Sequence, residues 1–302
     1  MSVILPNLIC LGQPKCGTTT LYAVCKGHPD IYVSDFKEPG FFSNEKSFKN
    51  GLKWYSNKYF SNFNGEKVIS EFTPYYLSSE TALKNIYESL SPDTKFLIVL
   101  RNPAKRSFSH YLHLKRDGLV SEPFETIMDR LALTYSKDKV LDDKIGKIYT
   151  DSLYDVHLSN YFKYFPDRSK ILILQFEEDL KKDCDGFKEK LSEFTGIEKG
   201  KFPSSVEAEN SSQSVAAFIV PIKRMLNADN IIKKITRKII PSHIMSKSKI
   251  RINSFLNRKF YKSSVGLDDE TLQSINMKLF SNSIENTEKL LSGEFSSLEY
   301  SK

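Results

Sequence analysis

Residues 12–20, GQPKCGTTT, place two glycines, a lysine and three threonines directly after the apolar run 8–11. A short strand, a glycine-containing loop and a helix start together form an anion site, because backbone N–H groups and the helix N-terminus face the bound phosphate. Lys15 adds a positive charge at the same place. We favour a phosphate-binding loop over an ordinary strand-to-helix turn that happens to contain two glycines.

This loop differs from the usual nucleoside-triphosphate loop. The pattern G-x-x-x-x-G-K-[ST] requires a lysine directly after the second glycine, where this chain has Thr18 after Gly17. The lysine stands instead at position 15, inside the loop. The position of Lys15 is a first indication that the transferred group is not a magnesium-bound γ-phosphate.

A second candidate anion site follows the apolar run 95–100. A kinase would normally end such a strand in an aspartate that binds magnesium, but this run ends in Arg101. Arginine binds a phosphate through two hydrogen bonds, and Ser109, about two helical turns further on, can reach the same phosphate. Two anion sites fit a nucleotide with phosphates at two separate positions better than a linear triphosphate.

The elements that carry these residues alternate between strand and helix. Strands are predicted at 8–11, 31–33, 68–73, 95–100 and 170–176, and helices at 19–26, 79–89, 104–116, 152–165 and 185–195. A helix and loop are expected over 47–63, and helical structure over 119–150. This alternation predicts an α/β fold with a parallel sheet covered on both faces. The Lys15 loop, Glu71 and Arg101 then lie at the carboxyl ends of strands, where ligands bind.

Composition narrows the class of protein. The 302 residues are 40% hydrophobic, enough for one large domain or two small ones. No apolar run approaches the length of a membrane span, and residues 1–12 lack the features of a signal peptide, so we expect a cytoplasmic protein. The four cysteines and five histidines form no metal-binding spacing, so no metal site is predicted. For Cys16, beside Lys15, a small residue that fits the loop is favoured over a reactive thiol.

Four motifs resemble those of one known family. LGQPKCGTTTLY resembles the 5′-phosphosulfate loop of sulfotransferases that use 3′-phosphoadenosine 5′-phosphosulfate (PAPS), and RNPAKRSFSHY resembles their 3′-phosphate motif. KEPGFF and EFTPYY resemble the heparan-sulfate-type carbohydrate branch, in a soluble, bacterial-like form. The resemblance covers about residues 7–197, with a weaker similarity at 258–295. It implies a P-loop-type three-layer fold and a single sulfotransferase domain over 1–302, with a core at 5–200, a basic helical segment at 204–262 and a C-terminal helix at 267–292.

The resemblance also implies roles for individual residues. Lys15 would contact the bridging oxygen and stabilise the departing diphosphate, and Arg101 with Ser109 would hold the 3′-phosphate. Glu71 would act as general base, because no histidine lies between His28 and His110 to take the role that histidine has in the phenol- and steroid-type enzymes. The alternative for Glu71 is a structural carboxylate paired with a lysine. The residues implied to surround the 5′-phosphate are Lys15, Cys16, Gly17, Thr18, Thr19 and Thr20.

One position departs from the family. The carbohydrate branch commonly has a lysine straight after the base glutamate, and this chain has Phe72. Lys37, in KEPGFF, is the candidate replacement, and Lys37 and Glu38 are assigned to substrate binding.

The net charge of +7 is concentrated in one segment. Residues 223–262 contain 12 lysines and arginines against the single Asp229, a net +11, which leaves −4 for the rest of the chain. Three interpretations stay open: a helix packed on the domain with a solvated basic face, peripheral attachment to anionic lipid, or binding of cofactor and acidic acceptor. The third is favoured for Arg258, Lys259 and Lys262, which the resemblance places over the 3′-phosphate, and the first for the remainder. Nucleic-acid binding is not predicted.

Together these observations predict a metal-independent transferase. It would move a sulfuryl group from PAPS, releasing 3′-phosphoadenosine 5′-phosphate (PAP), to a hydroxyl of a saccharide or glycolipid, with an amine as the second choice of acceptor. An acidic or lipid-linked acceptor, and a place at the inner face of the membrane, are further options. The alternatives are a small-molecule or nucleotide kinase, which would need magnesium, and a nucleotide-binding adaptor without turnover.

Overall fold

The computed structural model describes residues 3–137, 141, 143–180, 184–204, 214–215, 261–262 and 266–291. The chain divides into two compact units. The first comprises residues 1–106, 151–209 and 273–302, and the second comprises 107–150 and 210–272. This division does not test the predicted single sulfotransferase domain over 1–302, which stays a prediction.

The first unit contains a five-stranded parallel sheet in the order β2-β3-β1-β4-β5. All five strands lie within a residue or two of the positions predicted from their apolar runs, so the predicted parallel sheet is confirmed. Their bounds are β1 Leu8–Gly12, β2 Ile31–Val33, β3 Val68–Phe72, β4 Lys95–Leu100 and β5 Ile171–Gln175. Because the strands are parallel, their carboxyl ends meet at one edge of the sheet.

The helices of the first unit alternate with these strands along the chain up to β5, and α9, α10 and α15 follow β5. The predicted helices are confirmed to within two residues at each end, and the expected helix over 47–63 is two helices, α2 and α3. The bounds are α1 Thr18–Lys26, α2 Glu45–Phe48, α3 Gly51–Tyr59, α4 Glu80–Ser89, α8 Tyr154–Tyr164, α9 Phe176–Asp179, α10 Asp185–Thr195 and α15 Ser281–Leu290. The C-terminal helix predicted at 267–292 is a run of α14 Asp269–Ile275, a π-helical stretch Asn276–Phe280 and α15.

Local chemistry explains where α4 begins and where α10 ends. The Ser79 hydroxyl accepts a hydrogen bond from the Ala82 amide and caps the N-terminus of α4. Gly196 ends α10 with a φ of 70°, a left-handed conformation that glycine adopts without a steric penalty.

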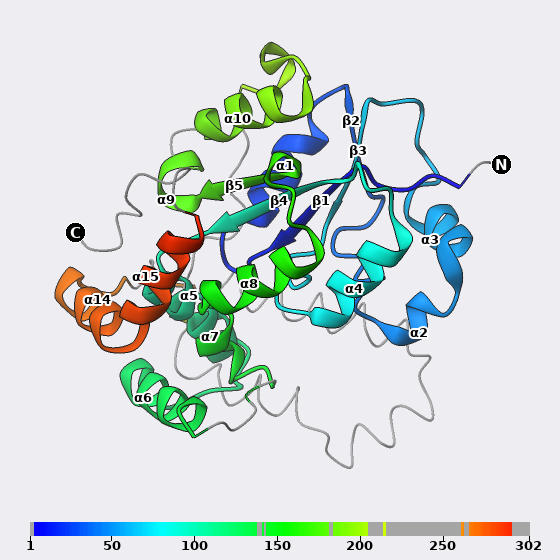
Figure 1. Ribbon diagram of the computed structural model, residues 1–302. Helices are drawn as coiled ribbons and strands as arrows, with labels where there is room; N and C mark the ends of the chain where they lie inside the picture. Colours follow the sequence, from blue (N-terminus) through cyan, green and yellow to red (C-terminus); the bar gives the residue numbers. More distant parts are fainter. Residues whose placement is uncertain are drawn as a thin grey trace. The chain divides into compact units, whose positions relative to one another are not determined.

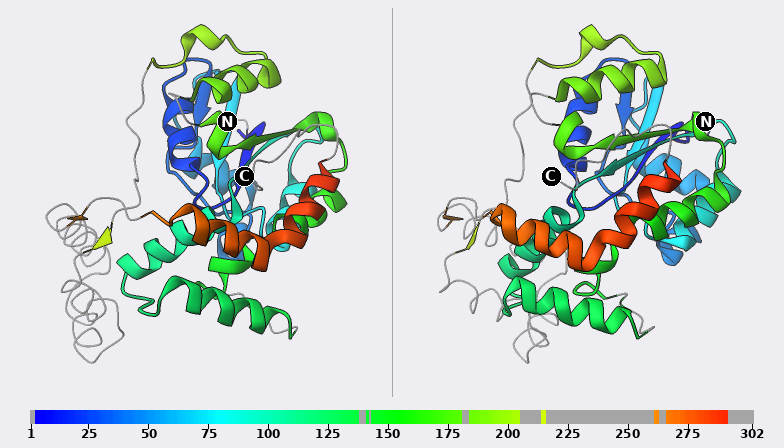
Figure 2. Two further views of the ribbon diagram at one scale, coloured as in Figure 1. Left: turned by 90° about the vertical axis from the view of Figure 1, so that its left-hand side faces the viewer. Right: turned by 60° about the vertical axis from the view of Figure 1, so that its left-hand side comes forward.

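Two hydrophobic clusters cover opposite faces of the sheet and make the fold three-layered. Ile9 and Ile98 pack with Tyr55 of α3, Leu83 of α4 and Leu158 of α8. The alternate strand residues pack with α1 and α10 in the second cluster, whose members include Cys10, Leu97, Leu21 and Phe187. Figures 1 and 2 show α1 and α10 on one side of the sheet and α4 and α8 on the other. The predicted α/β, P-loop-type three-layer fold is thus confirmed.

The second unit is mainly helical in its described part. It contains α5 from Ser107 onward (the whole helix is Pro103–Arg116), α6 Phe124–Tyr135, α7 Lys147–Thr150 and the antiparallel pair β6 Ser214–Val215 and β7 Tyr261–Lys262. Phe124 of α6 packs against Phe108 of α5, with ring centroids 5.1 Å apart. Residues 119–150 are therefore helical only in part. The Gly146 amide donates to the Asp143 carboxylate in a turn that precedes α7.

The basic helical segment expected at 204–262 is largely outside the described residues, including Arg258 and Lys259. Lys262 is described only as a backbone position in β7, opposite Ser214. In the described ranges, no helix is both long enough and apolar enough to cross a bilayer.

Gly12 permits a close approach at the carboxyl end of β1. A β-carbon at this position would lie 2.8 Å from the Pro74 carbonyl oxygen and 3.0 Å from the Leu77 β-carbon. The segment that follows β3 cannot easily retreat, because its Thr73 and Leu77 amides bond to the carbonyls of Cys10 and Leu11.

We therefore expect Gly12→Ala to lower the free energy of unfolding by about 1–3 kcal/mol through overpacking. Urea unfolding of purified protein measures this. Gly200→Ala is the matched control, because a β-carbon there would meet no atom within 4 Å. Equal losses for the two variants would contradict the prediction.

Candidate active site

The loop between β1 and α1 has the shape of an anion-binding nest. Lys15 and Gly17 both have positive φ angles, 73° and 83°. A β-carbon on Gly17 would lie 2.7 Å from side-chain atoms of Leu180 and Phe176, so only glycine fits there. In the described part of the chain, no side chain caps the N-terminus of α1. Left-handed residues beside an uncapped helix start turn backbone N–H groups toward one point, where an anion is stabilised.

Gln13 gives a second sign that a ligand belongs at this loop. Its side chain is 0% exposed, yet neither the amide nitrogen nor the amide oxygen has a hydrogen-bond partner among the described residues. Buried amides are almost always paired, so an unpaired one is expected where a ligand or a water completes the contacts. Sequence reasoning missed Gln13, because no loop pattern singles out this position.

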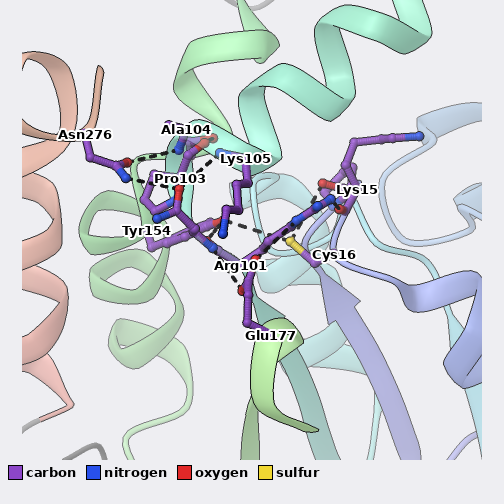
Figure 3. Close-up of polar contacts among 12 residues, drawn as sticks. Lys15, Cys16, Arg101, Pro103, Ala104, Lys105, Tyr154, Glu177 and Asn276 are labelled. Atoms are coloured by element: carbon purple, nitrogen blue, oxygen red, sulfur yellow. Dashed lines mark hydrogen bonds and ion pairs between the residues drawn. The ribbon is translucent and has the colours of Figure 1, made fainter. Parts of the chain in front are cut away.

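Arg101 follows β4 as predicted and contacts the loop directly (Figure 3). Its guanidinium donates to the Lys15 carbonyl over 3.2 Å, lies 3.4 Å from the Glu177 carboxylate and packs over the Phe176 ring. The Lys15 loop and Arg101, which were predicted to bind two separate phosphates, are thus in direct contact. The Lys15 side chain extends away from Arg101, so its ammonium and the guanidinium point to different places.

Ser109 lies on α5 and is half-buried. It belongs to the second compact unit, whereas Arg101 belongs to the first. A shared 3′-phosphate site of Arg101 and Ser109 therefore stays a prediction, as do the contributions of Arg258, Lys259 and Lys262.

Arg106 bonds to the backbone of the loop between β1 and α1. No role was assigned to it from the sequence. It is fully buried, and its guanidinium donates to the Pro14 carbonyl at 3.1 Å, to Asp151 at 3.1 Å and to the Ser152 hydroxyl at 3.2 Å. Asp151 is 45 positions away in the sequence, which is why no local pattern could reveal the pair. A buried charge with these partners is a structural anchor.

Glu71 lies at the carboxyl end of β3, beside β1, with Ile9 as its register partner. It is 0% exposed, and its carboxylate accepts hydrogen bonds from Thr73 at 2.6 Å and from Tyr55. Tyr76 contributes a third hydroxyl. No lysine pairs with it among the described residues, so the alternative of a lysine-paired structural carboxylate finds no partner there.

Burial raises the pKa of Glu71 above its ordinary value, and the hydrogen bonds from Thr73, Tyr55 and Tyr76 oppose this shift. A raised pKa suits a base that must take up a proton near neutral pH. Because the side chain is sealed from solvent, a proton can reach it only through a neighbouring hydroxyl or after a movement of the chain.

The KEPGFF loop lies over the end of β3. The Glu38 amide donates to the Phe72 carbonyl at 3.1 Å, and the Gly40 amide donates to the Thr73 hydroxyl at 3.3 Å. The Lys37 ammonium pairs with the Glu38 carboxylate, and both side chains are partly exposed. These two residues are thereby close to Glu71 in the fold, and their assignment to substrate binding stays a prediction.

The surroundings of Cys16 do not favour a reactive thiol. Burial raises its pKa to about 12, although the charges of Arg106 and Arg101 oppose the shift. Its sulfur lies 3.9 Å from the Tyr154 hydroxyl, which in turn donates to the Arg101 carbonyl. The residue fills space beneath the loop, as the small-residue interpretation predicts.

A cavity of about 510 Å³ lies away from this site. It is lined by residues at the ends of α4 and α8 and at the amino ends of β4 and β5, including Tyr87, Thr94 and Phe165. Since the chemistry-bearing residues gather at the carboxyl ends of the strands, this cavity is not part of the candidate active site.

Comparison with known proteins assigns this chain to a family. The family described as Sulfotransferase domain matches residues 5–218, most of the chain. This chain belongs to the sulfotransferase family. The crystal structure of a sulfotransferase from Alicyclobacillus acidocaldarius aligns with it at 26% identity and a TM-score of 0.56, covering 70% of this chain and 89% of that one.

Curated relatives point to the carbohydrate branch. Heparan sulfate glucosamine 3-O-sulfotransferase 6 of Mus musculus is 32% identical over 163 residues, which are 53% of this chain and 44% of that protein. The human heparan sulfate glucosamine 3-O-sulfotransferase 3B1 is 28% identical over 197 residues, 65% of this chain and 47% of its own length. The matched regions span less than half of these relatives. The resemblance to the heparan-sulfate-type branch, inferred from the KEPGFF and EFTPYY motifs, is confirmed.

The anchoring role of Arg106 in this sulfotransferase-family chain can be tested by substitution. Arg106→Met leaves Asp151 buried without its charge partner, so we expect the free energy of unfolding to fall by about 3–5 kcal/mol. Chemical unfolding measures the loss. Lys105→Met is the matched control, because Lys105 is half-buried on the same helix and its side chain makes no hydrogen bond or ion pair among the described residues. A loss no larger than that of the control would contradict the anchoring role.

Proposed function

We propose that this chain transfers a sulfuryl group from PAPS to a hydroxyl of a saccharide, with an amine as the second choice of acceptor. The observation that carries the proposal is the arrangement of three side chains at one edge of the sheet. Arg101 after β4 contacts the Lys15 loop after β1, and Glu71 ends the neighbouring strand β3. Membership of the sulfotransferase family supports it independently.

The strand order separates a donor side from an acceptor side. From β4 through β1 to β3 and β2, the edge carries Arg101, Lys15, Glu71 and then the Lys37 loop. Cations and backbone amides lie on the β4–β1 side, where a diphosphate would bind, and the carboxylate lies next to them on the acceptor side. In-line transfer needs this arrangement, with positive charge on the leaving oxygen and a base opposite it.

The residues present fit the cofactor. The left-handed positions at Lys15 and Gly17, the uncapped start of α1 and the unpaired amide of Gln13 offer donors to the 5′-phosphosulfate, and Thr18, Thr19 and Thr20 lie on the first turn of that helix. Arg101 would hold the 3′-phosphate. When bound, PAPS supplies an activated sulfuryl group on a diphosphate leaving group. Lys15 would stabilise negative charge on the bridging oxygen, and Glu71 would accept the proton of the acceptor.

The choice of a saccharide rests on the similarity to heparan sulfate 3-O-sulfotransferases and on the KEPGFF loop beside Glu71. Lys37 and Glu38 would contact the sugar. An acidic or lipid-linked acceptor fits the basic segment 223–262, and a cytoplasmic location, with or without contact to the inner membrane face, belongs to the same proposal.

Binding of PAP tests the cofactor assignment. We expect metal-independent calorimetric binding that persists in EDTA, and about 10- to 100-fold weaker binding by Arg101→Ala, because charge-assisted hydrogen bonds contribute about 1.5–3 kcal/mol. Lys105→Ala serves as the control for loss of a nearby charge. Magnesium-dependent binding of ATP, indifferent to a 3′-phosphate, would favour a kinase, and PAP binding without any turnover would favour an adaptor.

The pH dependence of the rate tests Glu71. The carboxylate must be ionised to accept a proton, so the rate should rise with pH through the pKa of Glu71. Burial raises that pKa, so the rise should lie above the pH range of an exposed glutamate. Glu71→Gln should lose this acidic limb and about 10²- to 10⁴-fold in turnover number. An unchanged acidic limb in the variant would exclude Glu71 as the base.

A further inference from the structure

Glu71 has no direct path to an acceptor in this structure. The side chain is fully buried, and so are the three residues whose hydroxyls bond to it, Tyr55, Thr73 and Tyr76. A base that removes a proton from a substrate must be within one hydrogen bond of it or be connected by a hydroxyl or water. The residue that provides this connection should carry an ionisable or hydroxyl proton and be partly exposed beside the Glu71 cluster.

Tyr75 meets both requirements. It is half-buried, whereas its neighbours Thr73 and Tyr76 are fully buried. Among the described residues its hydroxyl has no hydrogen-bond partner, and the ring packs edge-on against Tyr76 at 5.9 Å. A polar group held beside a catalytic carboxylate and left without a protein partner is expected to be satisfied by substrate or water.

Gly40 fixes where this hydroxyl lies. A β-carbon at Gly40 would collide with the Tyr75 hydroxyl oxygen, so that oxygen occupies the space that the glycine leaves open. The Gly40 amide donates to the Thr73 hydroxyl at 3.3 Å, and Thr73 donates to Glu71 at 2.6 Å. One glycine therefore contacts both the Tyr75 and the Thr73 hydroxyls, and the second of these already bonds to the carboxylate.

The electrostatic surroundings agree with this placement. Burial, followed by the charges of Glu38 and Glu71, raises the pKa of Tyr75 to about 12. The phenol is thus protonated at neutral pH and can both donate and accept a proton. The two carboxylates that raise it are the general base of the proposed function and the residue assigned there to substrate binding.

We propose that Tyr75 is a catalytic residue that receives the proton of the acceptor and passes its own proton, across a bridging water and Thr73, to Glu71. This inference rests on the proposed sulfuryl transfer. The acceptor oxygen forms a bond to sulfur while the bond between sulfur and the 5′-phosphate oxygen breaks, and its electron pair leaves with the diphosphate. The acceptor proton moves to the Tyr75 oxygen, the Tyr75 proton to the bridging water, a proton of that water to the Thr73 oxygen and the Thr73 proton to Glu71. The water and each hydroxyl therefore gain and lose one proton.

Tyr75→Phe tests the relay, because it removes the hydroxyl and keeps the ring that packs on Tyr76. We expect the turnover number with a heparan-type oligosaccharide and PAPS to fall by about 10²-fold or more, while the KM for the oligosaccharide changes less than about threefold. Tyr87→Phe is the matched control, since Tyr87 is 59% exposed on α4. PAP affinity and melting temperature, measured for each variant, should equal those of the wild type.

A double-substitution cycle that combines Tyr75→Phe with Glu71→Gln distinguishes a role in proton transfer from a purely structural role. If both residues serve one proton path, the double variant should be no slower than Glu71→Gln alone. Multiplying losses, an effect on KM only, or wild-type turnover by Tyr75→Phe would each overturn the relay. If Glu71→Gln fails to fold, the turnover number and KM of Tyr75→Phe decide the question alone.

The same assays separate the relay from the function on which it rests. A wild-type chain that transfers sulfuryl to neither the oligosaccharide nor water, measured as PAP release, contradicts the proposed function and the relay together. A wild-type chain that transfers sulfuryl while Tyr75→Phe matches it contradicts the relay only.

Discussion

The candidate active site depends on one buried charge, the guanidinium of Arg106. A charge removed from water is stable only when it is paired and its N–H groups find acceptors. Arg106 satisfies this requirement with the Pro14 carbonyl, Asp151 and Ser152, and Ser152 itself donates to the Pro103 carbonyl. These hydrogen bonds and the Arg106–Asp151 ion pair therefore hold together the loop after β1, the start of α5 and the segment before α8.

This anchoring explains how the loop keeps an unusual backbone. Positive φ angles at Lys15 and Gly17 cost conformational energy, most of all at the lysine, and persist where surrounding contacts enforce them. Arg106 holds the carbonyl that precedes Lys15, and Arg101 holds that of Lys15 itself. The amides are thus oriented before an anion arrives, which lowers the cost of stabilising charge during a reaction.

Sequence reasoning succeeded where a signal was local. The apolar runs 31–33 and 95–100 and the glycine after residue 195 gave element bounds that agree with the structure to the residue. Parallel strands then placed Lys15, Glu71 and Arg101 at one edge. The contacts of these side chains were not predictable, because Glu71 meets Tyr55 from 16 positions away and Arg101 meets Glu177 of α9, a helix that follows a different strand. Tyr55 belongs to an aromatic-rich region that indicates packing, and its hydroxyl contact appears only once the fold is formed.

Phe72 shows how the sheet decides which substitutions the site tolerates. Successive strand residues point to opposite faces. Glu71 shares the face of Ile9, with Tyr55, whereas Phe72 pairs in register with Cys10 and packs edge-on against Tyr22 of α1. A lysine at position 72 would enter an apolar core between the sheet and α1, where an unpaired ammonium is costly. The candidate replacement, Lys37, is on the loop whose Glu38 amide bonds to the Phe72 carbonyl, and its role at the site stays a prediction.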